Sequence, residues 1–328
     1  MMDGDRNLFS AAFTYLRQNG IIPLFAILFT ATSLFFPTFF KAETLGNLFR
    51  MASINGLLAV GVTYVIIAGD IDISVGSVMA WSCCVVGWMT NVNMGLLGII
   101  LAILSGLFFG FVMSVMIVEL KMPPFIASLA ILQSVRGLVF VTTNYEVIPV
   151  RGMPEWMRFI GRGQYLEIIT TPAAIFIVLV LITSYIFRRT NIGRSIYAVG
   201  GNREAARMMG LKVDRTLYFA HMMCSACAAL AGVVLTCRMG AVSSVTGDMA
   251  EMQAIAATVL GGTMLTGGVG KISGTFFGVM FMATLTNMFN MMSGVNTFWQ
   301  YVITGVLLLL VVLSQSISQN KAFLKARN

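Results

Sequence analysis

The sequence predicts an all-α integral membrane protein, and its composition indicates this in three ways. Of its 328 residues, 58% are hydrophobic and only 10% are charged, and the mean hydropathy is +0.87. Soluble domains contain about 25% charged residues. A soluble globule of this chain would leave large apolar surfaces in water, because its few charged side chains could not cover them. The composition also disfavours a disordered chain, a disulfide scaffold and a nucleic-acid-binding domain.

Ten apolar stretches are candidates for membrane-crossing helices. A crossing helix needs about 20 mostly apolar residues, and each stretch is bounded by charges, glycine, proline or polar clusters. The predicted spans are residues 21–40, 51–69, 73–91, 95–118, 123–143, 168–187, 216–237, 252–267, 272–292 and 297–316. The stretch 252–267 is the shortest, and whether it crosses completely is left open. Residues 1–328 are thus predicted to form one transmembrane domain.

The positions of lysine and arginine predict which side of the membrane each segment faces, because cytoplasmic loops carry an excess of them. With ten spans and an inner N-terminus, the inner segments hold 14 of these residues: Arg6, Arg17, Lys121, Arg188, Arg189, Arg194, Arg203, Arg207, Lys212, Arg215, Lys271, Lys321, Lys325 and Arg327. The outer segments hold six: Lys41, Arg50, Arg151, Arg158, Arg162 and Arg238. Both termini are therefore predicted to be cytoplasmic, and the net charge of +8 needs no nucleic acid to explain it.

Two carboxylates between the second and third spans stand out. Asp70 and Asp72 have no lysine or arginine near them in the sequence. One interpretation places them at the inner membrane face, with Asp72 or Ser74 capping the N-terminus of the third span. The other interpretation is that they line or gate a path through the membrane.

The longest predicted inner loop, residues 188–215, contains a predicted short helix. Gly200-Gly201-Asn202 is typical of a turn and helix start, residues 203–209 are mostly good helix formers, and Gly210 ends the helix. Ala205 and Ala206 are expected to present a small-residue surface, and Arg203 and Arg207 are expected to share a face suited to acidic partner residues. The helix either rests on anionic lipid or docks as a rigid body into a soluble partner.

A motif of the fourth span returns in the ninth. Residues 105–110 read Ser-Gly-Leu-Phe-Phe-Gly, and residues 273–278 read Ser-Gly-Thr-Phe-Phe-Gly. Gly69-Asp70 before the third span likewise returns as Gly247-Asp248 before the eighth. Copies five spans apart cross the membrane in opposite directions, so the echo predicts an inverted repeat of five helices. The spacing of Gly106 with Gly110, and of Gly274 with Gly278, predicts close helix packing.

Several longer motifs together resemble the membrane subunits of the ribose/xylose/galactose-type bacterial sugar ABC importers. They occur in order at residues 69–77, 125–129 with 135–137, 193–202, and 254–263 with 267–270. The resemblance covers about residues 44–313. It implies a permease subunit in the bacterial inner membrane that forms the path for a ribose-like pentose, a hexose or a similar small polar solute.

The resemblance also implies partners. A separate ATPase would hold ATP and Mg, a second permease copy or a paralogue would complete the pore, and a periplasmic binding protein would deliver the solute. This chain would itself bind no cofactor or metal and would carry no catalytic residue. Which solute is carried, and whether the pore is a homodimer or a heterodimer, are left open.

Functional residues follow from the same resemblance. Glu204-Ala205-Ala206 followed by Gly210 matches the coupling element of the family. Contact with the ATPase is therefore predicted for Asn202, Arg203, Glu204, Ala205, Ala206, Arg207 and Gly210. The predicted path or gate residues are Asn55, Asp70, Asp72, Ser74, Arg136, Glu251 and Gln253.

Two of the path residues need comment. The family usually has Glu-Leu-Asp where this chain has Glu251-Met252-Gln253, and this difference bears on which solute is carried. Arg136 lies within the fifth span, where a cation at the bilayer centre costs about 2.5–3.5 kcal/mol on insertion scales. A pairing with a carbonyl or with a carboxylate such as Glu251 is therefore expected.

An ion-coupled secondary transporter of a small solute is the alternative function. Such a protein needs carboxylates inside its spans for H⁺ or Na⁺. Here Asp70, Asp72, Glu119, Asp248 and Glu251 all fall near predicted span ends. An intramembrane enzyme is a third class, but the chain offers no evident nucleophile–base set, and His221 is its only histidine. The permease interpretation is therefore favoured.

Overall fold

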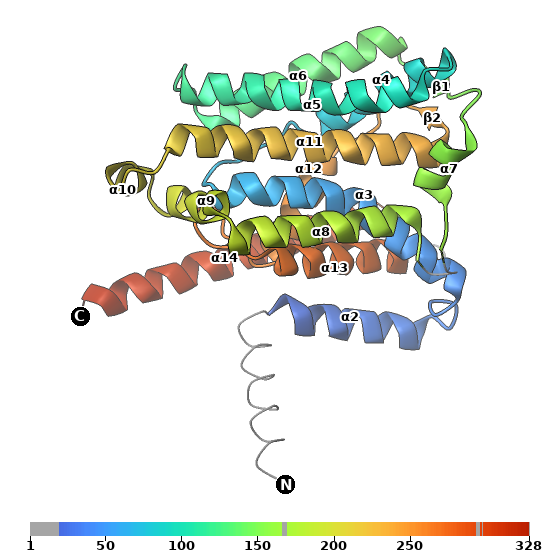
Figure 1. Cartoon of the computed structure of the whole chain (residues 1–328). Helices are drawn as coiled ribbons and strands as arrows, with labels where there is room; N and C mark the ends of the chain where they lie inside the picture. The colour runs from blue at the N-terminus through green and yellow to red at the C-terminus, as the bar shows by residue number, and fades with distance from the viewer. Residues whose placement is uncertain (1–19, 166–168, 293–295, 297, 328) are drawn as a thin grey trace.

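The computed structural model describes residues 20–165, 169–292, 296 and 298–327, and this part of the chain is almost entirely helical. The long helices lie side by side in one bundle (Figure 1). In chain order the elements are α2 (Ile21–Phe35), α3 (Ala42–Ile67), α4 (Val75–Asn91), α5 (Gly95–Val118), α6 (Pro124–Thr143), β1 (Ile148–Pro149), α7 (Glu155–Arg162), α8 (Thr171–Arg189), α9 (Asn191–Gly201), α10 (Arg203–Met208), α11 (Val213–Met239), β2 (Ala241–Val242), α12 (Ala250–Leu260), α13 (Ile272–Met291) and α14 (Trp299–Arg327). The all-α prediction is confirmed.

A helix overlaps each of the ten predicted spans. Six helices, α3, α5, α6, α8, α11 and α13, are long and apolar enough to cross a membrane by length and composition. α2, α12 and the first part of α14 are apolar but shorter, and α4 has 17 residues. The chain is thus a multi-pass membrane protein, while the number of ten crossings stays a prediction. Arg6 and Arg17, used to orient the chain, lie outside the described residues.

Short polar side chains set several helix starts. The Thr170 hydroxyl accepts a hydrogen bond from the Ala173 amide at 3.4 Å where α8 begins, and Thr190 does the same at 3.2 Å for α9. The Asn202 side chain accepts from the Ala205 amide at 2.9 Å and caps α10. Each of these bonds satisfies an amide that has no partner inside the helix. The predicted start at Asn202 is therefore correct, and α10 ends one residue before the predicted limit of 209.

The central helix of the bundle is α11, which packs against α3, α4 and α5 (Figure 1). Gly106 and Gly110 of α5 face the backbone of α11, where a Cβ at either position would overlap a main-chain carbonyl oxygen. Gly274 and Gly278 of α13 face the backbone of α12 in the same way. Both copies of the repeated motif therefore lie where two helices approach closely.

The two ends of the bundle carry different elements. α9 and α10 lie at one end, and β1, β2 and α7 lie at the other (Figure 1). β1 pairs antiparallel with β2, with Ile148 opposite Val242. Arg162 of α7 donates through Nε to the Arg238 carbonyl at 2.6 Å, which holds α7 against the end of α11. The sequence predicts loops where α7 and α9 are found. Both helices are short and amphipathic, and a search for long apolar runs does not detect them.

α4 and α12 both begin inside the bundle. A Cβ at Gly76 of α4 would overlap the Gly247 carbonyl just before α12, so the two helix starts are in contact. From there α4 runs to the α7 end, where the Asn91 amide donates to the Pro149 carbonyl at 3.1 Å. α12 runs to the opposite end, where the loop that follows it is bonded through the Gly268 amide to the Ile67 carbonyl at 2.9 Å.

The predicted span 252–267 is therefore not one continuous helix. α12 has 11 residues, which at 1.5 Å per residue is about 16 Å, against about 30 Å for a hydrocarbon core. The chain turns at Gly261 and Gly262, and Gly262 has a φ of +89° that ends helical geometry. Residues 243–249 connect β2 to α12. They form turns and no helix, and they cover the remaining distance.

Candidate functional site

Two non-helical segments lead from opposite ends of the bundle to the interior helix starts. The first approach, residues 70–74, connects α3 to α4, and the second approach, residues 243–249, connects β2 to α12. Irregular backbone at membrane depth is tolerated only where it is enclosed by protein or lines a wet cavity. Transporters use such interrupted helices to build solute sites near the membrane midplane. These two segments therefore define the candidate site.

Asp72 orders the turn of the first approach. Its side chain is fully buried, and its Oδ1 accepts hydrogen bonds from the Ser74 amide at 2.8 Å and the Ser74 hydroxyl at 2.7 Å. Ser74 occupies the N-cap position of α4, but its own side chain caps no helix amide. The capping bond expected of Asp72 or Ser74 is therefore not formed, because the Asp72 carboxylate binds Ser74 itself and, among the described residues, no side chain accepts from a first-turn amide of α4.

Asp70 has two side-chain partners, although none is near it in the sequence. It forms an ion pair with Arg203 of α10, and its Oδ2 lies 3.1 Å from Nε2 of His221 in α11. The Asp70 and His221 side chains are 1% and 0% exposed, and Arg203 is 39% exposed. Sequence reasoning missed this cluster because the partners lie 133 and 151 residues away. The available signal was a single histidine within an apolar span.

The remaining predicted path residues, Asn55, Arg136, Glu251 and Gln253, lie where α4 and α12 begin, beside Gly76 and Gly247, which are not among the predicted residues. We call this group, Asn55, Gly76, Arg136, Gly247, Glu251 and Gln253, the interior junction. The Glu251 carboxylate lies against Gly76 in the first turn of α4, a position where the helix dipole stabilises negative charge. The Asn55 amide donates to the Gln253 side-chain oxygen at 3.2 Å. The interior junction therefore gathers amide, carboxylate and backbone polar groups from α3, α4 and α12.

Arg136 of α6 completes the interior junction. Its Nη1 donates to the Thr246 carbonyl of the second approach at 2.6 Å. A main-chain carbonyl is one of the two kinds of partner expected from the sequence. The buried Glu251 and the exposed Asp248 both lie near enough to interact electrostatically with the guanidinium.

The interior helix starts also correct a sequence-based assumption about depth. Asp72 and Glu251 fall near predicted span ends, which from the sequence alone would keep them out of the interior of the bundle. Both are instead buried, and Glu251 lies at the contact between α4 and α12. The assumption is wrong because these two helices begin in the interior, so the end of a helix is not an end of the bundle.

The helix predicted to couple to a partner, α10, packs on its own chain. Ala206 is fully buried, Arg203 pairs with Asp70, and Arg207 pairs with Asp214 at 2.9 Å. The expectation that Ala206 presents a partner surface is therefore wrong, while both arginines have an acidic partner within the chain. A helix of six residues needs its own packing partners to be stable.

The large apolar side chains exposed at α10 are methionines. Met208 and Met209 are 81% and 70% exposed at its C-terminal end, and Gly210 follows with a φ of +79°. Beneath the helix lies a groove of about 500 Å³, lined by the end of α5, α10 and the start of α11. Its charged lining residues are Lys121, Arg203, Glu204, Arg207 and Asp214. Exposed methionines beside charged groups are suited to contact with another protein, because methionine adapts to irregular apolar surfaces.

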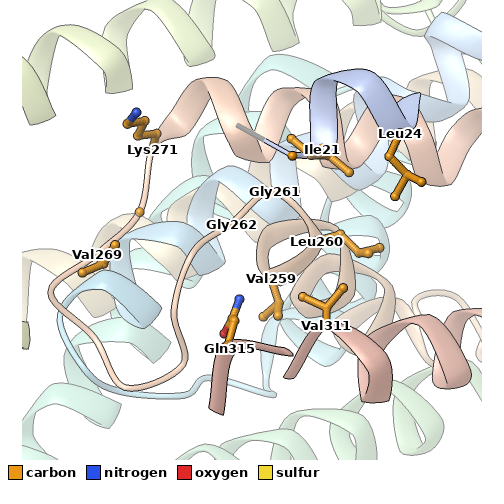
Figure 2. Close-up of a pocket in the computed structure, with 12 residues that line it drawn as sticks. Ile21, Leu24, Val259, Leu260, Gly261, Gly262, Val269, Lys271, Val311 and Gln315 are labelled. Carbon is orange, nitrogen blue, oxygen red and sulfur yellow. The ribbon is translucent and has the colours of Figure 1, made fainter. Parts of the chain in front are cut away.

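A second cavity of about 510 Å³ lies away from the interior junction (Figure 2). Its walls come from the start of α2, the end of α12, the loop to α13, and α14. Most of the lining is aliphatic or glycine backbone, and the Gln315 side chain points toward Gly262 (Figure 2). None of the residues predicted for the path lines this cavity. Among the described residues, no three His, Cys, Asp or Glu side chains are grouped to hold a metal ion.

Comparison with known proteins identifies relatives over most of the chain. Residues 44–312 match the family described as branched-chain amino acid transport system permease components. The chain is 38% identical to the ribose import permease protein of Bacillus subtilis over 88% of this chain and 89% of the relative. It is 33% identical to the ribose import permease protein of Escherichia coli K12, over 91% and 93% of the two chains, and 32% identical to the xylose transport system permease protein of that organism, over 87% of each. No solved structure matches the chain.

Proposed function

The chain belongs to the family of branched-chain amino acid transport system permease components, and from this premise we propose that its cargo is a monosaccharide. It is a multi-pass permease subunit of an ATP-driven importer in the bacterial inner membrane, and it is a transport component rather than an enzyme. The proposed cargo rests on one observation: relatives matched over most of both chains are named for ribose and xylose. The family description, in contrast, names amino acids.

The interior junction supports a polar solute. Hydroxyl groups of a sugar are recognised by hydrogen bonds from a few well-placed polar groups. Asn55 and Gln253 are half-buried amides, and their mutual bond of 3.2 Å can be exchanged for bonds to a solute. Asp72 and Ser74 lie just before the junction and shape the backbone that leads to it. We infer that the solute passes the interior junction.

The partners proposed for the permease are a separate ATPase that binds ATP and Mg, a second permease copy, and a periplasmic binding protein. Met208 and Met209 are the proposed anchors for the ATPase, and Glu204 and Gly210 lie exposed beside them. Asn202 and Ala205 contribute by capping and shaping α10. A docking role is favoured over a lipid-surface role because Arg203 and Arg207 each face a carboxylate of the same chain, which lowers the net positive charge that α10 offers to anionic headgroups.

An inverted repeat is proposed for the bundle, with both termini in the cytoplasm. The pattern of packing supports it. α11 packs on α4 and α5 as α3 packs on α12 and α13, and α6 packs on α4 and α5 as α14 packs on α12 and α13. This set of contacts is therefore unchanged when α3, α4, α5 and α6 are exchanged with α11, α12, α13 and α14, in that order. At the centre, α3 and α11 contact each other.

The cargo is tested by uptake into vesicles that contain the permease, its ATPase and its binding protein. We expect ATP-dependent uptake of at least one of [¹⁴C]ribose, [¹⁴C]xylose and [¹⁴C]arabinose, and no uptake of [¹⁴C]leucine. Uptake of leucine alone would overturn the sugar assignment. In the same preparation, Met208→Asp with Met209→Asp should lower recovery of the ATPase with the permease.

Met239→Asp is the matched control for this docking test, because Met239 is also an exposed methionine but ends α11 at the opposite end of the bundle. Its ATPase recovery should equal that of the unchanged protein. Equal recovery in the Met208–Met209 variant and in the control would contradict docking through α10.

Orientation is tested with a cysteine at Gly152, which is exposed in the segment between β1 and α7. The five native cysteines are buried, and they are replaced so that only the introduced cysteine can react. Gly152→Cys should react with an impermeant thiol reagent in intact spheroplasts. Labelling only after membrane rupture would contradict cytoplasmic termini in a ten-span chain.

A further inference from the structure

Three backbone segments meet at the base of α10 with no side chain between them. A Cβ at Gly200, where α9 ends, would overlap the Ile67 carbonyl at the end of α3 and the Gly268 amide in the loop before α13. The Gly268 amide donates to the same Ile67 carbonyl at 2.9 Å. Close-packed backbone has no flexible side chain to absorb a small displacement. The base of α10 is therefore in rigid contact with the segment that leads into the first approach.

One ion pair joins α10 to the first approach directly. Arg203 is the first residue of α10, and Asp70 is the first residue of the first approach. The Asp70 carboxylate is buried, so losing its cationic partner would leave an incompletely compensated charge in the interior. His221 holds the other carboxylate oxygen from α11, the central helix of the bundle. Asp70 is thus shared between a helix at the surface and a helix at the centre.

A second ion pair on the same helix provides a contrast. Arg207 pairs with Asp214 at the start of α11, and the two side chains are 63% and 55% exposed. The residues are seven apart in the chain, so this pair closes only the local turn between α10 and α11. Exposed pairs contribute little to stability. Arg203 and Arg207 are therefore chemically alike but connect α10 to different parts of the molecule.

We propose that the Arg203–Asp70 pair is the link that transmits a displacement of α10 to the start of α4 and so to the interior junction. The proposal rests on the proposed function, in which the ATPase acts on α10. Four residues lie between Asp70 and the first residue of α4, and the Asp72–Ser74 bonds keep this segment in one conformation. The first turn of α4 contacts Gly247 and Glu251. A pull on Asp70 therefore reaches both interior helix starts.

The test separates transmission from docking. The permease is reconstituted with its ATPase and binding protein, and uptake of [¹⁴C]ribose, [¹⁴C]xylose or [¹⁴C]arabinose is measured together with ATP hydrolysis and ATPase recovery. Arg203→Gln should lower the amount of sugar moved per ATP hydrolysed about tenfold or more, with ATPase recovery unchanged. Arg203→Lys keeps the charge and should restore the ratio to within about threefold of the unchanged protein.

Arg207→Gln is the matched control and should leave the ratio within about twofold of the unchanged protein. Asp70→Asn should behave as Arg203→Gln does. If Asp70→Asn does not assemble, Arg203→Gln still carries the test, because it leaves the buried Asp70–His221 contact in place. A normal ratio in Arg203→Gln would overturn the proposal. So would a loss of ATPase recovery equal to that of the Met208–Met209 variant, since Arg203 would then act in docking.

The unchanged protein distinguishes a failure of the proposed cargo from a failure of the Arg203–Asp70 link. If it moves none of the three sugars, the proposed cargo fails. The link is then judged by stimulation of ATP hydrolysis by the binding protein. Arg203→Gln should abolish this stimulation, and Arg207→Gln should retain it. Equal stimulation in both variants would overturn the link.

Discussion

The first and second approaches perform the same task by different means. Both bring the chain from one end of the bundle to an interior helix start. The first approach is held by charged and polar side chains, since Asp70 pairs with Arg203 and Asp72 accepts from Ser74. The second approach is held by its own turns, with the Thr246 amide bonded to the Ser243 carbonyl at 3.0 Å, and by Arg136 on a main-chain carbonyl.

This difference indicates which approach communicates with which part of the molecule. The partners of the first approach come from α10 and α11, so it is connected to the surface proposed to meet the ATPase. The partner of the second approach comes from α6, within the bundle. Movement driven by ATP is therefore expected to enter through the first approach, and the second approach is expected to respond at the interior junction.

The largest expected effect is at Gly76, where the two approaches meet. Gly76→Ala adds a Cβ that overlaps the Gly247 carbonyl and the Glu251 carboxylate. Overpacking typically costs about 1–3 kcal/mol and occasionally more, and the added Cβ here meets two groups at once, so the variant should show the largest loss of melting temperature and of folded protein. Gly137→Ala on α6 is the control, because a Cβ there meets no atom within 4 Å. Equal melting temperatures for the two variants would contradict the contact between the helix starts.

A smaller effect is expected at Arg136, which holds only the second approach. Arg136→Leu removes the bond to the Thr246 carbonyl and leaves Glu251 without a nearby cation. Hydrogen bonds to charged groups contribute about 1.5–3 kcal/mol, so uptake should fall about tenfold or more while ATPase recovery stays normal. Arg136→Lys should restore part of the uptake. Full uptake and normal expression of Arg136→Leu would show that the second approach does not depend on this side chain.

The smallest effect is expected at Gln253, which changes the chemistry of the interior junction but not its shape. Gln253→Glu keeps the length of the side chain and replaces an amide by a carboxylate, which can accept from Asn55 but cannot donate to a solute. The protein should fold normally. Relative uptake of ribose, xylose and arabinose should shift by about threefold to tenfold, since single polar contacts discriminate solutes by roughly 1 kcal/mol. Unchanged ratios would place the solute path away from Asn55 and Gln253.

Much of the molecule follows from local sequence. Apolar runs are sufficient to locate the long helices, because a chain in hydrocarbon must satisfy its backbone hydrogen bonds internally. The cap at Asn202 and the end of α10 before Gly210 follow from side-chain and backbone chemistry within a few residues. The repeated glycines at 106, 110, 274 and 278 identify close helix contacts, because only a missing side chain permits that approach.

The site itself depends on tertiary structure. Hydropathy measures how apolar a segment is but not how deep it begins, so the interior starts of α4 and α12 could not be predicted. Ala206 is a small residue that suits a partner groove or its own core equally well, and only packing placed it in the core. Asp70 finds Arg203 and His221 far along the chain, because a buried carboxylate needs compensating groups and the fold, not the sequence spacing, decides which groups lie within reach.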